Sequence, residues 1–387
     1  MSYLEKLLDG VEVEWKTLGE VAELITTGRL NANAMEENGA YPFFTCNETP
    51  YKINSYAFNL EAILISGNGS QVGHLNYYKG KFNAYQRTYI VSEFKNSTNI
   101  MFLFHYMKAY LKNYIIKNSK KGSIPYITMP MLLNFPVPIP TLAIQQKIVG
   151  ILDTFSELTA ELTAELTARK KQYEYYREQL LTFEEDEVEW KTLGDNTVGK
   201  FIRGSGLQKK DFTNTGVGCI HYGQIYTYYG TYTDKTKTFV SKEFAQKARK
   251  AKYGDLIIAT TSENDEDVCK AVAWLGNEEI AISSDACFFR HNLNPKYVAY
   301  FFQTALFQKQ KQPLITGTKV RRVNANDLAK IKIPIPSLEE QARIVSILDK
   351  FDTLTSSISE GLPREIELRE KQYEYYRDLL LSFPKDQ

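Results

Sequence analysis

Several features that would narrow the function are scarce or absent in this 387-residue sequence. It has only four cysteines and four histidines, no Cys-x-x-Cys pair, and no cysteine near a histidine at the spacing of a zinc site. We therefore expect no metal site and interpret the cysteines as reduced thiols of a cytoplasmic protein. No apolar run reaches about 18 residues and no signal peptide is recognisable, so a membrane protein is not predicted.

The sequence also has almost no net charge, because 47 Lys and Arg residues face 46 Asp and Glu residues. This balance excludes a chain that is basic throughout, so any nucleic-acid surface must come from local clusters of basic residues. A hydrophobic content of 43% supports genuine cores, and the length predicts more than one domain.

Motifs of catalysis are missing as well. The tetrapeptide Asn294-Pro295-Lys296-Tyr297 resembles an adenine methyltransferase motif, but Lys296 replaces its second proline, and Asn294 and Pro295 fit a helix start. The Glu-x-Lys tripeptides lack the upstream acidic partner of a magnesium-dependent nuclease. Neither a phosphate-binding Gly-x-x-x-x-Gly-Lys-Ser/Thr loop nor a legible Ser-His-Asp set is present. We therefore predict a chain without catalytic activity of its own.

What the sequence does contain is an internal repeat. Three segments occur twice: residues 13–19 return at 188–194, residues 139–153 at 335–349, and residues 171–177 at 371–377. Between these matched segments the two halves differ strongly. A repeated frame that holds two unlike inserts suggests a molecule that reads two different things at a fixed separation.

The repeated segments after each insert predict long helices. Apolar residues recur at helical spacing from Leu142 to Phe183 and again from Leu338 to Phe383. Proline loses a backbone hydrogen bond and clashes with the preceding turn, so the stretch 361–363, Gly-Leu-Pro, should break or kink the second helix.

The two helical copies differ in length by one short unit. Their offset is 349 − 153 = 196 at the aspartates and 371 − 171 = 200 at the lysines. The first copy contains Thr-Ala-Glu-Leu twice in this stretch, at 159–166. Four residues add about one helical turn, or about 6 Å. The units fit a spacer of adjustable length, and equally a coiled-coil filler made of good helix formers.

Each insert predicts an α+β domain. Short β-rich runs such as 62–65 and 255–258 are broken by Gly, Asn and Asp, and one helix is expected near 99–116 and near 295–311. The predicted boundaries are an N-terminal segment 1–18, a first domain 19–138, a helical spacer 139–185, a second domain 186–333 and a second spacer 334–387.

Two basic runs stand at matching places in the repeat. Residues 108–121 and residues 309–322 each contain five basic side chains and no acidic one, and each run ends at a Gly-Ser or Gly-Thr loop. A single run of this kind is usually a solvated face, but its recurrence in two diverged domains favours a phosphate-binding surface. Arginine there could also donate a bidentate pair to guanine.

Other polar loops suit the reading of base edges, although each taken alone also fits an ordinary polar turn. The candidate DNA-binding residues of the first domain are Arg29, Ser66, Asn68, Gln71, Gln86, Arg87, Lys120, Lys121, Ser123 and Tyr126. Those of the second domain are Arg203, Lys209, Lys210, His221, Tyr222, Gln224, Thr261, Ser262, Asn264, Thr318, Lys319, Arg321 and Arg322.

The matched segments resemble the specificity subunits of Type I restriction–modification enzymes, in particular the IC subclass. The resemblance covers nearly the full length. It rests on Glu-Trp-Lys-Thr-Leu-Gly at 14–19 and its copy, on Pro-Thr/Ser-Leu through Ile-Leu-Asp in both halves, on the Thr-Ala-Glu-Leu units, and on the C-terminal run from 360 through Lys-Gln-Tyr-Glu-Tyr-Tyr.

The resemblance implies an α+β architecture in which two target recognition domains are separated by two long antiparallel helices, in a pseudo-twofold, circularly permuted layout. Each domain would read one half of an asymmetric DNA target, and the helices would set the gap. It also implies partners: double-stranded DNA, two modification subunits that carry S-adenosylmethionine for adenine N6 methylation, and two restriction subunits that use ATP and Mg²⁺. No cofactor is expected on this chain.

Helices of the modification subunits would cover the long apolar stripe. The positions expected near that contact, some of which must instead face the second helix, are Leu158, Leu162, Leu166, Tyr173, Tyr176, Tyr373 and Tyr376. Two other functions stay open at this point: a two-headed adaptor that binds proteins rather than DNA, and an autonomous methyltransferase. The paired basic runs argue against the adaptor, and the missing motifs argue against the enzyme.

Overall fold

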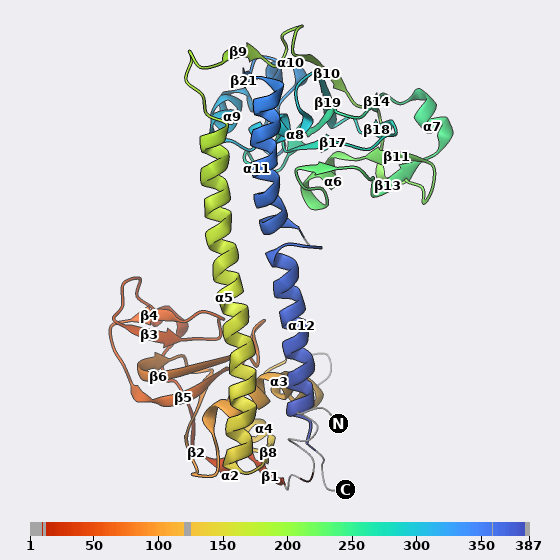
Figure 1. Cartoon of the computed structure of the whole chain (residues 1–387). Coiled ribbons are helices and arrows are strands. Elements are labelled where there is room, and N and C mark those ends of the chain that lie inside the picture. Colours follow the sequence, from red (N-terminus) through yellow and green to blue (C-terminus); the bar gives the residue numbers. More distant parts are fainter. Residues whose placement is uncertain (1–9, 11–12, 120–124, 358, 384–387) are drawn as a thin grey trace. The chain divides into compact units, whose positions relative to one another are not determined.

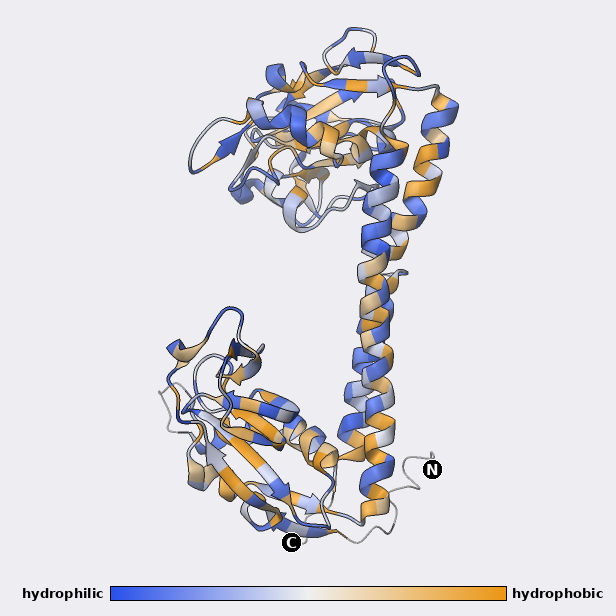
Figure 2. Ribbon diagram, turned by 90° about the vertical axis from the view of Figure 1, so that its left-hand side faces the viewer, coloured by the Kyte–Doolittle hydropathy of each residue, from blue (hydrophilic) through white to orange (hydrophobic). Residues whose placement is uncertain are grey.

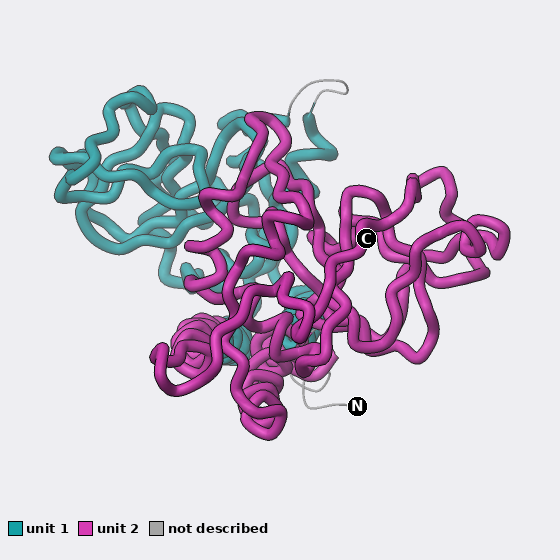
Figure 3. Tube along the Cα trace, turned by 90° about the horizontal axis from the view of Figure 1, so that it is seen from above, with its two compact units in different colours: residues 1–162, 366–387 teal, residues 163–365 magenta. Residues whose placement is uncertain are grey.

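The computed structural model describes residues 10, 13–119, 125–357 and 359–383. The chain divides into two compact units, drawn in different colours in Figure 3. Unit 1 consists of residues 1–162 and 366–387, and unit 2 consists of residues 163–365. Unit 1 thus combines the two ends of the chain, whereas unit 2 is one continuous segment, as expected for a circularly permuted repeat.

Unit 1 is built on a six-stranded sheet with the strand order β2-β7-β5-β6-β3-β4 (Figure 1). Its elements are β1 (Glu14–Thr17), α2 (Leu18–Val21), β2 (Ala22–Thr27), β3 (Tyr41–Phe44), β4 (Tyr51–Ile53), β5 (Phe58–Ser66), β6 (Leu75–Ala84), β7 (Thr88–Phe94), α3 (Ile100–Asn118), α4 (Met129–Leu133) and β8 (Pro136–Ile139), with a 3-10 turn at Ala32–Ala34. Side chains alternate between the two faces of a strand. Ile63 and Ile65 of β5 therefore point to one face, where they form a core with α3.

Unit 2 contains a five-stranded sheet, β10-β19-β15-β17-β12, and a four-stranded sheet, β13-β11-β18-β14. Its strands are β9 (Glu189–Thr192), β10 (Gly199–Arg203), β11 (Val217–Ile220), β12 (Tyr232–Thr233), β13 (Thr238–Val240), β14 (Lys250–Ala251), β15 (Leu256–Ala259), β16 (Thr261–Ser262), β17 (Ala271–Trp274), β18 (Ile280–Ile282), β19 (Ala286–His291), β20 (Arg321–Arg322) and β21 (Lys332–Ile335). Its helices are α6 (Tyr222–Thr227), α7 (Lys242–Lys247), α8 (Pro295–Phe301), α9 (Ala305–Lys311) and α10 (Ala325–Leu328), with 3-10 turns at Lys209–Asp211 and Gln312–Leu314.

The two units share a common sheet plan. Four strands follow one another in the same order, β2-β7-β5-β6 in unit 1 and β10-β19-β15-β17 in unit 2, and all neighbouring pairs in these sets are antiparallel. A further strand then pairs in parallel, β3 on β6 and β12 on β17. Hydrophobic residues recur along the strands and helices of both units (Figure 2). The inserts therefore share a five-strand plan despite their unlike sequences, and unit 2 adds a second sheet.

The repeated segments at the borders of each insert pair with each other. In unit 1, β1 pairs antiparallel with β8, and Glu14 stands opposite Ile139. In unit 2, β9 pairs with β21 in the same register, and Glu189 stands opposite Ile335. The repeated Glu-Trp-Lys-Thr motif is thus a strand that joins the beginning of a domain to its end.

The two predicted long helical copies are confirmed, including the break in the second copy. Helix α5 (Leu142–Leu180) is continuous, whereas the second copy consists of α11 (Leu338–Ser356) and α12 (Leu362–Leu380). Pro363 is the second residue of α12, where the backbone N–H has no partner within the helix and a proline is tolerated.

The helical copies run antiparallel within unit 1. Ile148 and Leu152 of α5 share a core with Leu380, and farther along α5 the ring of Phe155 stacks on Tyr376 of α12 at 5.2 Å between centroids. Residue numbers therefore rise along α5 as they fall along α12. Residues 366–383 in this way contribute to the same core as residues near the start of the chain.

A buried glutamine ties each helical copy to its own domain. Gln145 donates from Nε2 to the carbonyl of Pro140 (2.7 Å), and its Oε1 accepts from the backbone N–H of Asn99 (2.7 Å). Gln341 makes matching bonds, and its Oε1 accepts from the backbone N–H of Asn294 (2.8 Å). Both glutamines are fully buried, so each bond is shielded from water.

An aspartate two turns later holds the same domain helix in each unit, but its partners differ. Asp153 lies 2.8 Å from Nε2 of His105, which is buried, and burial lowers the pKa of this imidazole. Asp349 instead accepts from Lys296 Nζ (2.7 Å) and from the hydroxyl of Tyr300 (2.7 Å). The repeated helical segment thus keeps the aspartate as acceptor, and each domain supplies different donor side chains.

One predicted element of the fold was wrong. The sequence predicted a single helix near 295–311, but the structure has α8 and α9 there. Thr304 causes the division, because its hydroxyl accepts from the backbone N–H of Phe307 (3.2 Å) and so starts a new helix. Across the described residues, no helix has the length and hydropathy of a membrane span, and no group of three or more potential metal ligands is found.

Candidate nucleic-acid interface

Three segments of unit 1 meet beside the end of β5. The backbone N–H of Gly67, which follows β5, donates to the carbonyl of Arg87 in the turn before β7 (2.9 Å). The backbone N–H of Ile127, just before α4, donates to the carbonyl of Gly67 (2.8 Å). We name this junction of residue 67, residues 85–87 and residues 126–127 the unit 1 corner.

The unit 1 corner is hollow and polar. The hollow has a volume of about 350 Å³ and is lined by Gly67, Gln86, Arg87, Tyr89, Tyr126 and Ile127. Gln86 and Arg87 are exposed, and Tyr126 is 40% exposed. Tyr89 is already engaged, because its hydroxyl donates to the carbonyl of Ile127 (2.9 Å). An amide, a guanidinium and an aromatic ring therefore stand together at the surface, which suits base edges, phosphates and stacking.

Unit 2 has the same junction at the equivalent place. The backbone N–H of Thr260, which follows β15, donates to the carbonyl of Asp285 in the turn before β19 (2.9 Å). The backbone N–H of Val323, just before α10, donates to the carbonyl of Thr260 (3.1 Å). We name residue 260, residues 283–285 and residues 322–323 the unit 2 corner.

These backbone bonds align the two corners position by position. Arg87 of unit 1 corresponds to Asp285 of unit 2, because each offers its carbonyl to the residue after the central strand. Tyr126 corresponds to Arg322, because each directly precedes the residue whose N–H closes the junction. The backbone arrangement is shared, while the side chains at equivalent positions differ in charge and size.

A glycine allows the chain to pass close to the corner in each unit. A Cβ atom on Gly28 would lie 1.9 Å from the carbonyl oxygen of Ala84, and one on Gly204 would lie 1.9 Å from that of Ser283. Any other residue would force the backbone apart at this point. The stretches that begin at Gly28 and Gly204 are thereby held against the corner of their unit. Arg29 directly follows Gly28 and therefore lies beside the unit 1 corner.

Several predicted residues of unit 2 gather around its corner. The guanidinium of Arg203 donates from Nε to the carbonyl of Ser284 (3.3 Å), and the backbone N–H of Tyr222 donates to the hydroxyl of Ser283 (2.9 Å). His221 is nine-tenths buried beside them, with its ring 4.6 Å from that of Tyr222. The corner therefore collects residues that lie far apart in the sequence.

Electrostatics place His221 among charged neighbours. Burial lowers the pKa of its imidazole, the charge of Lys209 lowers this pKa further, and the carboxylate of Asp285 raises it. The three side chains consequently share one electrostatic environment at the unit 2 corner. Lys209 and Lys210 are both exposed there.

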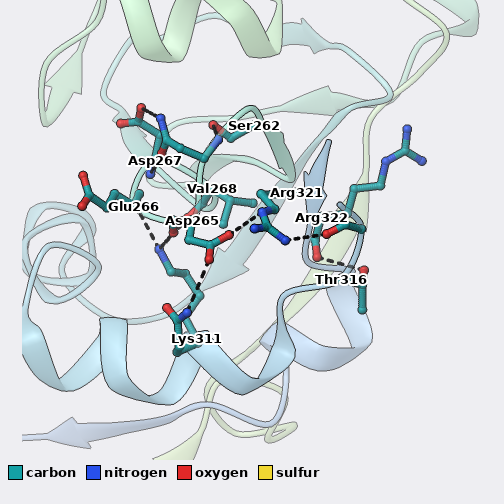
Figure 4. Close-up of polar contacts among 12 residues, drawn as sticks. Ser262, Asp265, Glu266, Asp267, Val268, Lys311, Thr316, Arg321 and Arg322 are labelled. Carbon is teal, nitrogen blue, oxygen red and sulfur yellow. Dashed lines mark hydrogen bonds and ion pairs between the residues drawn. The ribbon is translucent and has the colours of Figure 1, made fainter. Parts of the chain in front are cut away.

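Lys311 has a role that the sequence did not reveal. Its side chain is 1% exposed, and Nζ donates to the carbonyls of Asp265 (2.8 Å), Glu266 (3.1 Å) and Val268 (3.0 Å) (Figure 4). Burial lowers the pKa of this ammonium group. The prediction that the whole run 309–322 forms a phosphate-binding surface is therefore wrong at Lys311, which holds the acidic loop 265–268 in place.

The two consecutive arginines of β20 also have different roles. Arg321 forms an ion pair with Asp265 (Nε to Oδ1, 2.7 Å) and donates to the carbonyl of Gly317 (2.6 Å). Arg322 is exposed, and in Figure 4 its side chain extends away from the acidic loop. Arg321 therefore stabilises the loop, and Arg322 is the one available to a ligand.

Five predicted contact residues do not offer a free side chain, one of them His221, which is 9% exposed and whose Nδ1 accepts from the backbone N–H of Gly223 (3.2 Å). Ser66 and Thr261 are 2% and 7% exposed, so neither reaches the surface. The amide of Gln224 caps α6 and donates to a threonine, and the amide of Asn264 is bound to Asp267 through both of its polar atoms. For Ser66 and Thr261 burial replaces the prediction of DNA contact, whereas for the residues engaged in a cap or a turn the contact stays a prediction.

The remaining predicted residues lie at or near the surface. Exposed are Arg29, Gln71, Gln86, Arg87, Tyr126, Arg203, Lys209, Lys210, Thr318, Lys319 and Arg322, and half-buried are Asn68, Tyr222, Ser262 and Arg321. Lys120, Lys121 and Ser123 lie outside the described residues. Sequence reasoning missed Ser284 and Asp285, which no motif marks and which only the backbone alignment of the two corners identifies.

The tyrosines of the helices divide into buried and exposed ones. Tyr173 is 8% exposed and stacks on Phe351 at 6.3 Å between centroids, so it faces the second helical copy. Tyr175 and Tyr375, which were not predicted as contacts, are 61% and 66% exposed. Tyr176 is 39% exposed. The other predicted contact positions are Leu158, which is exposed, and Leu162, Leu166, Tyr373 and Tyr376, which are half-buried.

Comparison with known protein families gives a match to both halves. The family model described as "Type I restriction modification DNA specificity domain" matches residues 10–169 and again residues 185–368. The two matches together cover most of the chain.

Similar curated proteins match over nearly their whole length. The Type I restriction enzyme EcoR124I/EcoR124II specificity subunit of Escherichia coli is 35% identical over 400 residues, which span 100% of this chain and 98% of that protein. A putative type I restriction enzyme specificity subunit of Haemophilus influenzae is 35% identical over 408 residues, which span 99% of this chain and 98% of that protein.

Solved structures show the same fold at lower identity. The Type-I restriction-modification system S subunit from M. genitalium aligns with a TM-score of 0.59 at 15% identity and covers 100% of both chains. A chain from work on complex assembly and conformational transition of the type I R-M system aligns with a TM-score of 0.61 at 14% identity, and covers 97% of this chain and 98% of that one.

Proposed function

The chain belongs to the family of type I restriction–modification DNA specificity proteins, and from this premise we propose that each unit reads one half of a two-part, asymmetric DNA target. The observation that carries the proposal is the pair of corners: one backbone junction occurs twice, with unlike side chains at its equivalent positions. Two copies of the same surface would favour a palindromic target, whereas unlike surfaces favour an asymmetric one.

Exposed basic side chains support contact with the DNA backbone. Arg29 and Arg87 lie at or beside the unit 1 corner, and Lys209, Lys319 and Arg322 are exposed in unit 2. Phosphate neutralisation by such groups releases counterions, so binding would fall steeply with salt concentration. A protein-binding adaptor has no reason to show this salt dependence on duplex DNA.

The gap between the half-sites is proposed to be set by the helices. Helix α5 is 39 residues long and belongs to both units, so it would extend about 58 Å. It carries the Thr-Ala-Glu-Leu units in its middle. Lengthening a continuous helix adds rise without altering its ends, which makes it suited to a spacer.

Two modification subunits are the proposed partners of the helices. The repeated Lys-Gln-Tyr-Glu-Tyr-Tyr motif places one strongly exposed tyrosine in each unit, Tyr175 in unit 2 and Tyr375 in unit 1. Tyrosine at such a position is typical of residues that dominate binding at protein interfaces. Two equivalent surfaces fit two copies of one partner.

The chemistry is proposed to reside on those partners. Modification subunits would carry S-adenosylmethionine and methylate adenine, and two restriction subunits would use ATP and Mg²⁺ to translocate and cleave DNA. The present chain would select the target and hold the subunits on it. It is expected to transfer no methyl group when incubated alone with labelled S-adenosylmethionine and DNA.

A pair of substitutions tests the reading of half-sites. Methylation-sensitive sequencing of cells that carry the chain with its partners would define the target, and duplexes altered in either half would then be bound by the complex. Arg87→Ala should abolish discrimination in one half-site only, and Arg322→Ala in the other half-site only. Both side chains are exposed, so neither substitution should unfold the chain.

Lys332→Ala provides the control, because Lys332 is an exposed basic residue of β21 outside the corner. It should leave discrimination in both half-sites intact. Loss of discrimination in both halves by Arg87→Ala or by Arg322→Ala alone would contradict the assignment of one half-site to each unit. Duplex binding that does not change between low and high salt would favour the adaptor function instead.

A further inference from the structure

Asp285 is an unexpected residue to find at the unit 2 corner. It occupies the position that Arg87 occupies in unit 1, as the matching backbone bonds to Thr260 and Gly67 establish. Arginine at such a position attracts phosphates, whereas a carboxylate repels them. The two corners therefore differ in the sign of the charge at one equivalent point.

The carboxylate of Asp285 has no structural role among the described residues. Its backbone carbonyl forms the junction, accepting from the N–H and from the hydroxyl of Thr260 (both 2.9 Å). Among the described residues no cation forms an ion pair with its carboxylate, whose charge acts on the nearby imidazole of His221. The side chain is half-buried, so its oxygens can still accept hydrogen bonds from a ligand.

The neighbours of Asp285 are suited to a DNA backbone, which limits what the carboxylate can contact. Arg322 belongs to the same corner and Lys209 shares the electrostatic environment of His221, and both are exposed. Basic groups on this surface would bring phosphates close. A carboxylate in the same place is tolerated only when it meets a hydrogen-bond donor, and on DNA the donors that reach the major groove are amino groups of bases.

Cytosine fits this requirement better than adenine. The N4 amino group of cytosine is a donor with no acceptor on the same base edge in the major groove, and Asp and Glu accept from it. Adenine offers its N6 amino group beside the N7 acceptor, which would face the second carboxylate oxygen with like partial charge. Guanine and thymine present acceptors at this place and no donor.

We propose that Asp285 is a specificity-determining residue, whose carboxylate accepts a hydrogen bond from the N4 amino group of a cytosine in the half-site read by unit 2. The inference rests on the proposed function. It adds the base class that this corner selects and the atom that selects it. Arg87 at the equivalent position of unit 1 has the opposite preference, for the acceptor edge of guanine.

The test uses the full chain with its modification subunits and a duplex library randomised across both half-sites. For the unaltered chain, one position in the half-site weakened by Arg322→Ala should require cytosine. Asp285→Asn should move the preference at that position from cytosine toward adenine, by roughly tenfold, because an amide pairs with N6 and N7 together. The preferences in the other half-site should not change.

Asp234→Asn is the matched control, because Asp234 is an exposed acidic residue of unit 2 that follows β12. It removes the same charge and should leave every base preference unchanged. If Asp285→Asn leaves the base preferences unchanged, or strengthens binding to all sequences equally, Asp285 does not read a base. The proposed function survives either result as long as both half-sites remain selected, and it fails only if the unaltered complex shows no preference in one half.

Discussion

At the scale of single residues, two lysines of the same basic run have opposite environments. Lys309 is exposed, whereas Lys311 is buried and donates to three carbonyls of loop 265–268. The two residues are lysines two positions apart in the same basic run, so no local sequence pattern distinguishes them. Their difference arises from a loop more than forty residues earlier, which folds over Lys311.

Lys311→Met should therefore loosen this loop. The substitution keeps most of the apolar stem but removes the donor from three loop carbonyls, one in a buried bond and two in part-buried bonds, which should cost about 2 kcal/mol of local stability. Hydrogen exchange of peptides from 262–270 would measure the change, and exchange in unit 1 should stay the same. Lys309→Met serves as the control and should have almost no effect. Equal exchange in both variants would contradict the structural role of Lys311.

A histidine with both ring nitrogens buried, His291, should make the stability of unit 2 depend on pH. Burial lowers the pKa of His291 from 6.5 to about 4. Above pH 6.5 the imidazole is neutral in the folded and unfolded chains, so it has no effect on stability there. Between pH 6.5 and about 4 only the unfolded chain binds the proton, so stability falls by about 1.4 kcal/mol per pH unit.

The free energy of opening of β19, measured by hydrogen exchange at pH 7, 6 and 5, would check this prediction. It should drop by about 2 kcal/mol by pH 5. His291→Phe keeps an aromatic ring beside Phe289 and removes the titrating group, so its pH dependence should be correspondingly shallower. An identical slope for the two proteins would show that other groups cause the loss.

Much of the site was predictable residue by residue, and the failures have a common cause. Gln86, Arg87, Tyr126 and Arg322 were predicted and stand at the two corners. Ser66 and Thr261 were predicted from their position at or after the end of a strand, but both are buried, Ser66 as the last residue of β5 and Thr261 within β16. Composition reveals which side chains can bind DNA, and tertiary packing decides which ones are exposed.

At the scale of elements, the repeated motifs proved to be the frame of the fold. The strand motif and the buried glutamine recur in both units with equivalent backbone partners, whereas the helical aspartate recurs with different side-chain partners. Helical periodicity and the Gly-Leu-Pro stretch predicted α5 and the division between α11 and α12 correctly. The order of the sheet strands was not predictable, because strand pairing depends on contacts between distant segments.

The exposed tyrosines of the helices provide a test of partner binding. Tyr175→Ala and Tyr375→Ala should each weaken one of two equivalent sites for a modification subunit, by roughly thirtyfold for a side chain that dominates an interface. Native mass spectrometry would follow the stoichiometry. Each single variant should retain one modification subunit under conditions where the unaltered chain binds two, and the double variant should retain none.

Tyr253→Ala is the control for this experiment. Tyr253 is 60% exposed in unit 2 but lies outside the helices. It should leave the stoichiometry unchanged. If Tyr175→Ala and Tyr375→Ala retain both modification subunits at the same affinity as this control, the partners bind elsewhere on the chain.

At the scale of the whole molecule, the chain combines one fold used twice with a helix that belongs to both copies. Unit 1 contains both ends of the chain, which is the permuted layout that the resemblance to specificity subunits implied. Under the proposed function the duplicated fold would let one chain select a longer target, because two reading domains together contact more bases than one. What the sequence could not supply is the chemistry of each corner, since the corners align through backbone bonds and not through shared residues.

The central claim is that the helix sets the distance between two independent readers. Insertion of one further Thr-Ala-Glu-Leu unit after Leu166 lengthens α5 by about 6 Å, close to two base-pair rises of about 3.4 Å. A Gly-Ser-Gly-Ser insertion at the same place is the control, because it adds equal length but breaks the helix.

The decisive measurement is methylation-sensitive sequencing of DNA from cells that carry the lengthened chain with its partner subunits. We predict methylated targets with both half-site sequences unchanged and a gap longer by one or two base pairs, whereas the glycine–serine insertion should blur or abolish the preference for one gap. Targets with an unchanged gap, or with a new half-site sequence, would contradict the account.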